Sequence, residues 1–383
     1  MKALRWLYPV LAVALLVIIP WLTYRFRPAR RLDLVVLDKT VPFRNRIEHR
    51  SLFWLLEHLN VVKPDGTGYR VDNDYLGAFP GPVPGDPPER TRDLTTADVG
   101  SARLVYLADT YGVYRDDLRS GREEKAALER SPKIYGGLTQ DEASAAAGAP
   151  ASGKTLVAEF NTLGSPTGTA ARGTLEAALG VRWTRWIGRY FPHLDDAGEV
   201  PGWMRRDYER EWGKPWKFRG AGYVLMQDDE HCEVLRTGFE ADSVGLTIEI
   251  EPGRGPDLGS ARGGVPYPYW FDVVDDGGGG ATRLASFHWH ATPSGRERLA
   301  ARGLAEVFPA VTRRDGSPSG AAWYLAGDFA DNPMDTRPVP FAGYLALRGF
   351  IESWKVAPSE TAFYWMFYAP MMRKILTESE SLR

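Results

Sequence analysis

The chain has 383 residues, 44% of them hydrophobic, with a formal net charge of −2 and a single cysteine, Cys232. The first 31 residues hold six basic residues and no acidic one, so the remainder carries 41 basic against 49 acidic residues, a net charge of about −8 that disfavours a phosphate backbone and excludes a nucleic-acid partner. One cysteine excludes an internal disulfide and a cysteine-based zinc site.

The first segment predicts a membrane anchor. Residues 6–24 are uncharged and mostly apolar, with aromatic residues near both ends, and this length is close to the roughly 20 residues that cross a bilayer core. A secretory signal peptide has a shorter apolar core and a small-residue cleavage site, so we expect an uncleaved signal-anchor. The flanking charges mildly favour a cytoplasmic domain, whereas a signal-anchor commonly delivers the following domain outward. We expect a single-pass protein of the bacterial cytoplasmic membrane, with residues 1–31 as anchor and basic flank and an extracytoplasmic domain.

From residue 32 onward, short β-rich runs alternate with helical patterns, which is typical of βαβ units and a parallel sheet. Residues 33–38, 104–109 and 154–160 predict strands, and residues 46–60 predict a helix. Thr139 and Glu142 form a capping box ahead of an Ala-rich helix. The sequence therefore predicts an α/β domain over residues 32–240.

Four apolar runs in this chain end on, or one residue before, a carboxylate: Asp38, Asp109, Glu159 and Asp328. In an open α/β sheet, ligands bind outside the carboxyl ends of the strands. These positions therefore predict a ligand site more firmly than they predict a reaction.

A resemblance covers residues 34–187. The order of strand, helix and strand ending in a polar loop, followed by GGLTQDEASAAAGAPASGKTLVAEFN, resembles the class I glutamine amidotransferase-like fold and its ThuA-like relatives. The resemblance implies a flavodoxin-like, mainly parallel layered sheet. Amidotransferases place a cysteine in a tight elbow after a strand, and the loop NTLGSPT has none, so amidotransferase activity is not expected.

The second half of the chain has a different sequence pattern, in which runs typical of strands alternate with turn-like spacers. Runs at 223–226, 246–250, 269–274 and 283–290 predict strands, and four glycines at 277–280 predict a hairpin loop between two of them. We expect a β-rich insertion over residues 241–295, and a return to the α/β domain over residues 296–383 with a C-terminal aromatic helix. The tryptophan-rich stretch 183–216 suits either sugar faces or ordinary core packing, and both alternatives stay open.

Strand-end carboxylates can supply acid–base chemistry, because two that converge can hold one proton between them, as glycoside cleavage requires. We expect Asp109, Glu159 and Asp328 to be the catalytic set, while Asp38, beside Lys39, caps the helix that follows. The alternative is that each acid bonds nearby backbone amides and has no catalytic role. The expected substrate-binding neighbours are Tyr111, Asn161, Thr162, Ser165 and Asp331.

Other chemistries have weaker support in the sequence. His288 and His290 share one strand face and can bind zinc only with a third ligand that the sequence does not place, so we expect no metal and no cofactor. His49 is expected to be a surface histidine, with a general base near Asp38 as the alternative. Ser165 and Thr167 are expected to be helix N-caps, because no G-x-S-x-G elbow surrounds them.

The functional prediction is a membrane-anchored extracytoplasmic α/β protein that binds or hydrolyses envelope or extracellular glycan with its strand-end carboxylates. The alternative is a non-catalytic envelope scaffold or interaction protein with a vestigial amidotransferase-like pocket and a protein partner. The sequence does not decide whether the chain is an enzyme. The expected partners are a glycan or another small polar ligand, together with a membrane bound through residues 6–24.

Overall fold

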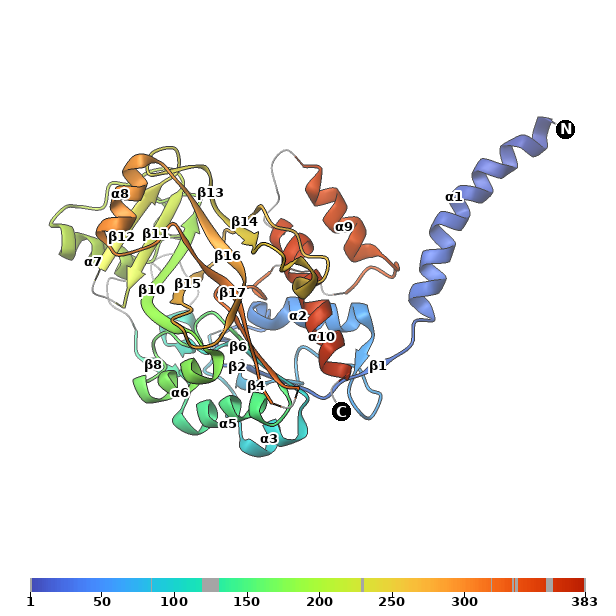
Figure 1. Ribbon diagram of the computed structural model, residues 1–383, viewed down its shortest axis with the longest axis horizontal. Helices are drawn as coiled ribbons and strands as arrows, with labels where there is room; N and C mark the ends of the chain where they lie inside the picture. Colours follow the sequence, from blue (N-terminus) through green and yellow to red (C-terminus); the bar gives the residue numbers. More distant parts are fainter. Residues whose placement is uncertain are drawn as a thin grey trace.

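The protein is a mixed α/β structure built around one large sheet (Figure 1). The computed structural model describes residues 2–83, 85–118, 131–228, 231–317, 319–332, 334, 337–355 and 361–381, with side chains described from residue 11 onward. The large sheet has ten strands in the order β14-β13-β16-β17-β18-β9-β6-β2-β4-β5.

One half of this sheet is parallel. Its strands are β4 (Leu76–Phe79), β2 (Leu34–Asp38), β6 (Leu104–Asp109), β9 (Thr155–Glu159) and β18 (Ala321–Leu325), with β5 (Arg90–Arg92) antiparallel at the edge. The residues of β6, β9 and β18 are buried throughout, as expected for parallel strands with both faces covered. The strand predictions that end in Asp38, Asp109 and Glu159 are confirmed.

The other half is antiparallel, so the prediction of a mainly parallel sheet is correct for only part of it. Its strands are β17 (Val307–Asp315), β16 (Thr282–Ala291), β13 (Ala241–Ile250) and β14 (Val265–Pro266). Antiparallel neighbours need no long crossover, and β16 connects to its neighbour β17 through the short helix α8 (Pro293–Ala301). The sheet is therefore mixed.

A second, four-stranded antiparallel sheet lies beside the large one, in the order β12-β11-β10-β15. Its strands are β12 (His231–Arg236), β11 (Gly222–Gln227), β10 (Arg182–Phe191) and β15 (Phe271–Asp275). It packs with α7 (Gly202–Trp212) around a small apolar core of its own that includes Met204, Val224 and Cys232. The β-rich residues are thus shared between two sheets. The predicted domain boundaries at 240 and 295 stay predictions.

Helices cover both faces of the parallel half (Figure 1). On one face lie α3 (Thr96–Ser101), α5 (Gln140–Ala151) and α6 (Thr169–Leu179), and on the other lie α2 (Ile47–Leu59) and α10 (Ala369–Ser381). The predicted capping box of Thr139 and Glu142 begins α5 and is confirmed. The other short elements are β1 (Arg30–Arg31), β3 (Val61–Val62), β7 (Val113–Tyr114), β8 (Lys133–Tyr135), α9 (Tyr344–Ser353), the 3-10 turns Asp116–Leu118 and Gly255–Leu258, and the π-helical turn Tyr364–Tyr368.

The predicted membrane anchor requires a correction. Its residues form α1 (Lys2–Arg25), which projects from the body (Figure 1). Within the described part of the chain, no helix combines the length and the apolar character needed to span a bilayer. This contradicts the prediction of a single-pass membrane protein anchored through residues 6–24, and the anchor and the extracytoplasmic placement are not retained.

Candidate functional site

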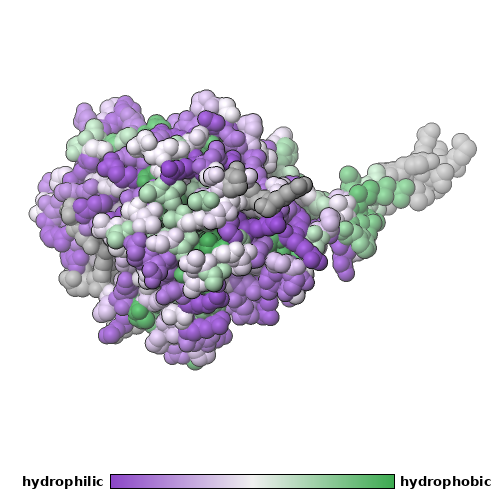
Figure 2. Space-filling view, turned by 60° about the horizontal axis from the view of Figure 1, so that its bottom comes forward, coloured by the Kyte–Doolittle hydropathy of each residue, from purple (hydrophilic) through white to green (hydrophobic). Residues whose placement is uncertain are grey.

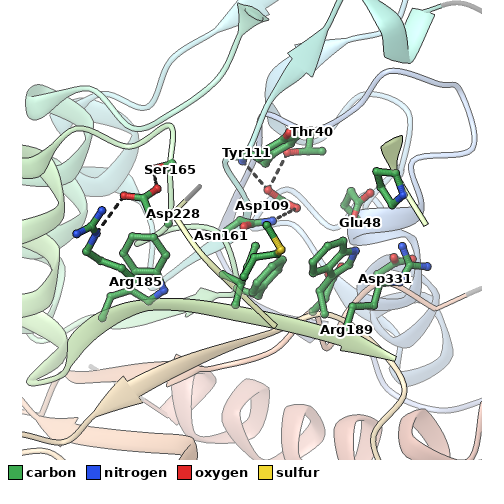
Figure 3. A pocket seen from close by; sticks show the side chains of 18 of the residues that line it. Thr40, Glu48, Asp109, Tyr111, Asn161, Ser165, Arg185, Arg189, Asp228 and Asp331 are labelled. Carbon is green, nitrogen blue, oxygen red and sulfur yellow. Dashed lines mark hydrogen bonds and ion pairs between the residues drawn. The ribbon is translucent and has the colours of Figure 1, made fainter. Parts of the chain in front are cut away.

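A pocket opens at the carboxyl ends of the neighbouring strands β2 and β6 (Figure 3). The strand order switches direction here, because β4 lies on one side of β2 whereas β6 and the later parallel strands lie on the other side. Its volume is about 370 Å³, within the range of small-molecule sites. The surface of the body is mostly hydrophilic, with apolar side chains scattered between polar ones on the face in Figure 2. The lining of the pocket combines carboxylates, arginines and aromatic rings: Glu48, Asp109, Asp117, Asp228, Asp328, Asp331, Arg185, Arg189, Tyr111, Phe160, Trp183, Trp203 and Trp270.

Asp109 lies in the pocket and is held by donors from three segments. Its Oδ1 accepts from the Thr40 hydroxyl at 2.8 Å and from the Tyr111 backbone N–H at 2.6 Å, and its Oδ2 accepts from the Asn161 amide at 3.5 Å. Burial raises the pKa of Asp109 to about 7. The hydrogen bond from the Tyr111 N–H lowers this pKa, and the charge of the nearby Asp38 raises it. Asp109 can therefore exchange a proton near neutral pH.

A second group of carboxylates comprises Glu48, in the first turn of α2, and Asp328 and Asp331, in the loop after β18. One oxygen of each lies within 4.8 Å of the others. Burial and mutual repulsion raise the pKa of Glu48 and of Asp328 well above their usual values. Burial raises the pKa of Asp331 to about 6, and the Arg189 charge opposes that rise. Asp331 is therefore the member that ionises most easily.

The third predicted catalytic residue, Glu159, lies beneath this lining. It is fully buried, accepts a hydrogen bond from the Tyr106 hydroxyl, and accepts another from the Ala330 N–H at 3.2 Å. The Tyr106 hydroxyl also bonds that of Tyr368 at 2.9 Å. Of the three acids, Asp109 and Asp328 face the pocket and Glu159 lies in the core.

Most of the predicted substrate-binding residues line the pocket, and one of them lies outside it. Tyr111, Asn161, Ser165 and Asp331 line the pocket. Thr162 is buried and donates to the backbone carbonyl of Glu159 at 2.6 Å, outside the lining. The expectation that Ser165 caps a helix is wrong, because α6 begins after Gly168 and the Ser165 hydroxyl donates to Asp228 at 2.7 Å.

The backbone of the pocket is strained at three positions. Asn161, Arg185 and Asp228 have φ values of 64°, 73° and 41°, although none is glycine. Each such conformation costs about 1–3 kcal/mol and persists where the surroundings impose it, commonly at ligand sites. Arg185 lies at a bulge in β10, and its Nε donates to Asp228 at 3.2 Å. Figure 3 shows Arg185 and Asp228 with Ser165 at one end of the pocket, whereas Asn161 lies beside Asp109.

Aromatic rings form the walls between the polar groups. Trp183 and Trp203 come from the tryptophan-rich stretch, and Trp270, just before β15, stacks on Phe160 with ring centroids 6.0 Å apart. Trp216 instead packs with neighbouring rings and donates to the Leu194 carbonyl at 2.8 Å. Some rings of this stretch therefore line the pocket and others pack in the body. Sugar binding by the rings that line the pocket stays a prediction.

Sequence reasoning missed several residues of the site, and Glu48 is the clearest example. It lies on a helix, not at a strand end, so the strand-end pattern does not find it. The expectation that His49 is a surface histidine is wrong: it is buried, with Nδ1 2.5 Å from Asp38 Oδ2 and Nε2 3.2 Å from the Val71 carbonyl. This contact makes the Asp38–His49 pair an internal support behind the pocket.

Arg185, Asp228 and Trp270 were also missed. Arg185 and Asp228 come from adjacent strands of the smaller sheet, and no local pattern marks them as partners. His288 and His290, the predicted alternative metal pair, belong to no group of potential metal ligands in the described part of the chain.

No family model matches this chain, and no curated protein matches it either. The fold and the pocket therefore define its class: a mixed α/β protein with an acidic, aromatic-walled site at the strand ends.

Proposed function

We propose that this chain binds a polyhydroxylated ligand, a glycan fragment, in the pocket and hydrolyses it with carboxyl groups. One observation carries the proposal: Asp109 and Asp328, from the ends of two different strands, face a single cavity that Trp183, Trp203 and Trp270 also line. Flat aromatic faces pack against sugar rings, and carboxylates bond their hydroxyls.

The strand order supports the position of the site. If the five parallel strands are numbered by their order in the chain, they lie in the sheet in the order 2-1-3-4-5. This is the flavodoxin-like arrangement, in which the ligand binds at the switch point between the first and third strands. Asp38 and Asp109 end those two strands here.

The carboxyl groups differ enough to divide the roles of acid and base. With a pKa of about 7, Asp109 holds a proton for a leaving group at neutral pH. Asp331, with a pKa of about 6, ionises before Asp328, so the Asp328–Asp331 pair supplies the negative charge. Neighbouring acids with separated pKa values are what acid–base hydrolysis of a glycoside requires.

The test uses the full chain against a panel of oligosaccharides, with tryptophan fluorescence for binding and reducing-end release for cleavage. Asp109→Asn is expected to bind as the wild type does and to lose cleavage by about 100-fold or more. Asp65→Asn, in an exposed turn, is the matched control and retains both.

Failure to bind any oligosaccharide would sink the proposal. Binding without cleavage in the wild type would leave the non-catalytic alternative, an interaction protein that holds a glycan without hydrolysing it.

A further inference from the structure

The carboxylates of Glu48, Asp328 and Asp331 converge from two separate segments, the start of α2 and the loop after β18 (Figure 3 labels Glu48 and Asp331). Three acids brought so close repel one another, and a fold tolerates this only when something neutralises them. The Arg189 charge acts on Asp328 and Asp331, and its guanidinium lies over the rings of Phe191 and Trp270, 5.2 and 5.4 Å from their centroids.

The hydrogen-bonding state of Asp328 is a second, independent observation. Its side chain is only 5% exposed and faces the pocket. In the part of the chain that the structure describes, no backbone N–H, hydroxyl, amide or cationic group donates to its carboxylate, which bonds only to another acid, Asp331. Buried carboxylates are normally bonded by such donors, as Asp109 is by Thr40 and Tyr111. Asp328 therefore faces the pocket without the donor that a buried carboxylate normally has.

We infer that Glu48, Asp328 and Asp331 bind one hard divalent cation, Ca²⁺. An all-oxygen, all-carboxylate set suits Ca²⁺ and Mg²⁺, whereas zinc sites are built mainly from histidine and cysteine. The inference does not depend on the ligand of the pocket being a glycan.

The number of carboxylates favours Ca²⁺. Ca²⁺ takes about six to eight oxygen ligands, several of them carboxylates, whereas Mg²⁺ is usually held by one or two carboxylates and keeps several waters. One oxygen of each of the three carboxylates lies within 4.8 Å of the other two, so the three can converge on one ion. The open side of the pocket leaves room for water or ligand hydroxyls to complete its coordination.

The binding test uses the full chain freed of metal with a chelator and titrated with Ca²⁺, Mg²⁺ or Tb³⁺ in the absence of any sugar. We expect one Ca²⁺ per chain by calorimetry, and Tb³⁺ luminescence excited through Trp270, which lines the same pocket. Asp331→Asn removes one charged ligand and is expected to weaken Ca²⁺ binding by about 100-fold or more.

Asp228→Asn is the matched control. This carboxylate lines the same pocket but is already bonded by Ser165 and Arg185, so its removal is expected to leave the Ca²⁺ affinity within about threefold.

Thermal unfolding separates a cation site from a purely structural cluster. With chelator present, Asp331→Asn is expected to melt at a higher temperature than the wild type, because it removes like-charge repulsion. Added Ca²⁺ is expected to raise the melting temperature of the wild type and not that of Asp331→Asn. Absence of saturable binding of both Ca²⁺ and Mg²⁺ to the wild type overturns the inference, and tighter binding of Mg²⁺ than of Ca²⁺ overturns its assignment to Ca²⁺.

Discussion

At the scale of single residues, the strand-end acids differ in chemistry because they differ in partners. Asp38 is buried against His49, Asp109 is held by neutral donors, and Glu159 is bonded by the hydroxyl of Tyr106. A carboxylate buried among neutral groups and other acids is driven to take up a proton. Burial raises the pKa of Asp109 to about 7, so its protonation changes near neutral pH.

The raised pKa of Asp109 predicts a pH dependence of stability. The folded state holds the Asp109 proton up to about pH 7, whereas the unfolded chain releases it near its ordinary value of 3.8. The folded state therefore binds more protons between these values, so the free energy of unfolding falls as the pH rises from about 4 to about 7 and levels off above that. Asp109→Asn cannot titrate, and its free energy of unfolding is expected to change less between about pH 5 and pH 8, by about 1 kcal/mol or more.

Urea unfolding at both pH values, with chelator present, measures this difference. Asp65→Asn serves as the control, because that exposed carboxylate has a lowered pKa and does not titrate in this window. A wild-type pH dependence retained in full by Asp109→Asn contradicts the prediction.

At the scale of elements, the position of the site depends on how closely β4 approaches β2. Gly77 in β4 has a φ of 113°, and a Cβ there would lie 1.7 Å from the backbone carbonyl oxygen of Asp38. No side chain fits this contact without separating the two strands. The end of β2, which leads into Thr40 and the pocket, is thus held in place by a glycine in the next strand.

Gly77→Ala is expected to destabilise the fold by about 3 kcal/mol or more, because the strained φ and the backbone clash act together. Gly173→Ala, in the helix α6 where an added Cβ would meet open space, is expected to stabilise the protein by about 0.5–1 kcal/mol. Chemical denaturation of both variants measures the contrast, and equal stability of the two would refute the role given to Gly77.

At the scale of the whole molecule, the C-terminal segment completes the core of the first half. Most of the buried apolar residues form one continuous cluster that runs from Leu32 to Leu376. The hydroxyl of Ser379 in α10 donates to Thr155 of β9 at 3.0 Å, and Arg30 pairs with Glu380 at 3.0 Å. Residues from the first and the last part of the sequence therefore pack into the same core.

Truncation after Tyr368 is expected to abolish the cooperative unfolding transition, because it removes the buried side chains of α10 from the central core. Removal of residues 1–19 is the control and is expected to keep the transition, because the described residues of α1 before Pro20 are almost all exposed. Thermal circular dichroism distinguishes the two, and a cooperative melt in the C-terminal truncation would contradict the prediction.

Much of the local structure could be predicted from the sequence. Runs such as 104–109 and 154–160 predicted strands that the structure confirms, because a buried strand needs consecutive apolar residues. The lack of a cysteine in any strand-end loop also excluded thiol chemistry from the sequence alone. The prediction from the apolar run at residues 6–24 was wrong, because hydropathy alone predicted a membrane span that the described helices do not contain.

The membership of the site could be predicted only in part. Asp109, Asp328 and Tyr111 follow strand ends and do reach the pocket, whereas Glu159 satisfies the same rule and points into the core. Glu48 breaks the rule and lines the pocket.

The sequence by itself determined which segments are buried, which acids follow strands and which nucleophiles are missing, because these depend on neighbouring residues. Only the tertiary structure decided which acids meet, since Glu48 and Asp331 are brought together by the packing of α2 against the loop after β18. It also decided that β10, β11 and the residue before β15 supply the walls. Burial follows from local pattern, but convergence follows from strand order and long-range packing, which no short stretch of the sequence encodes.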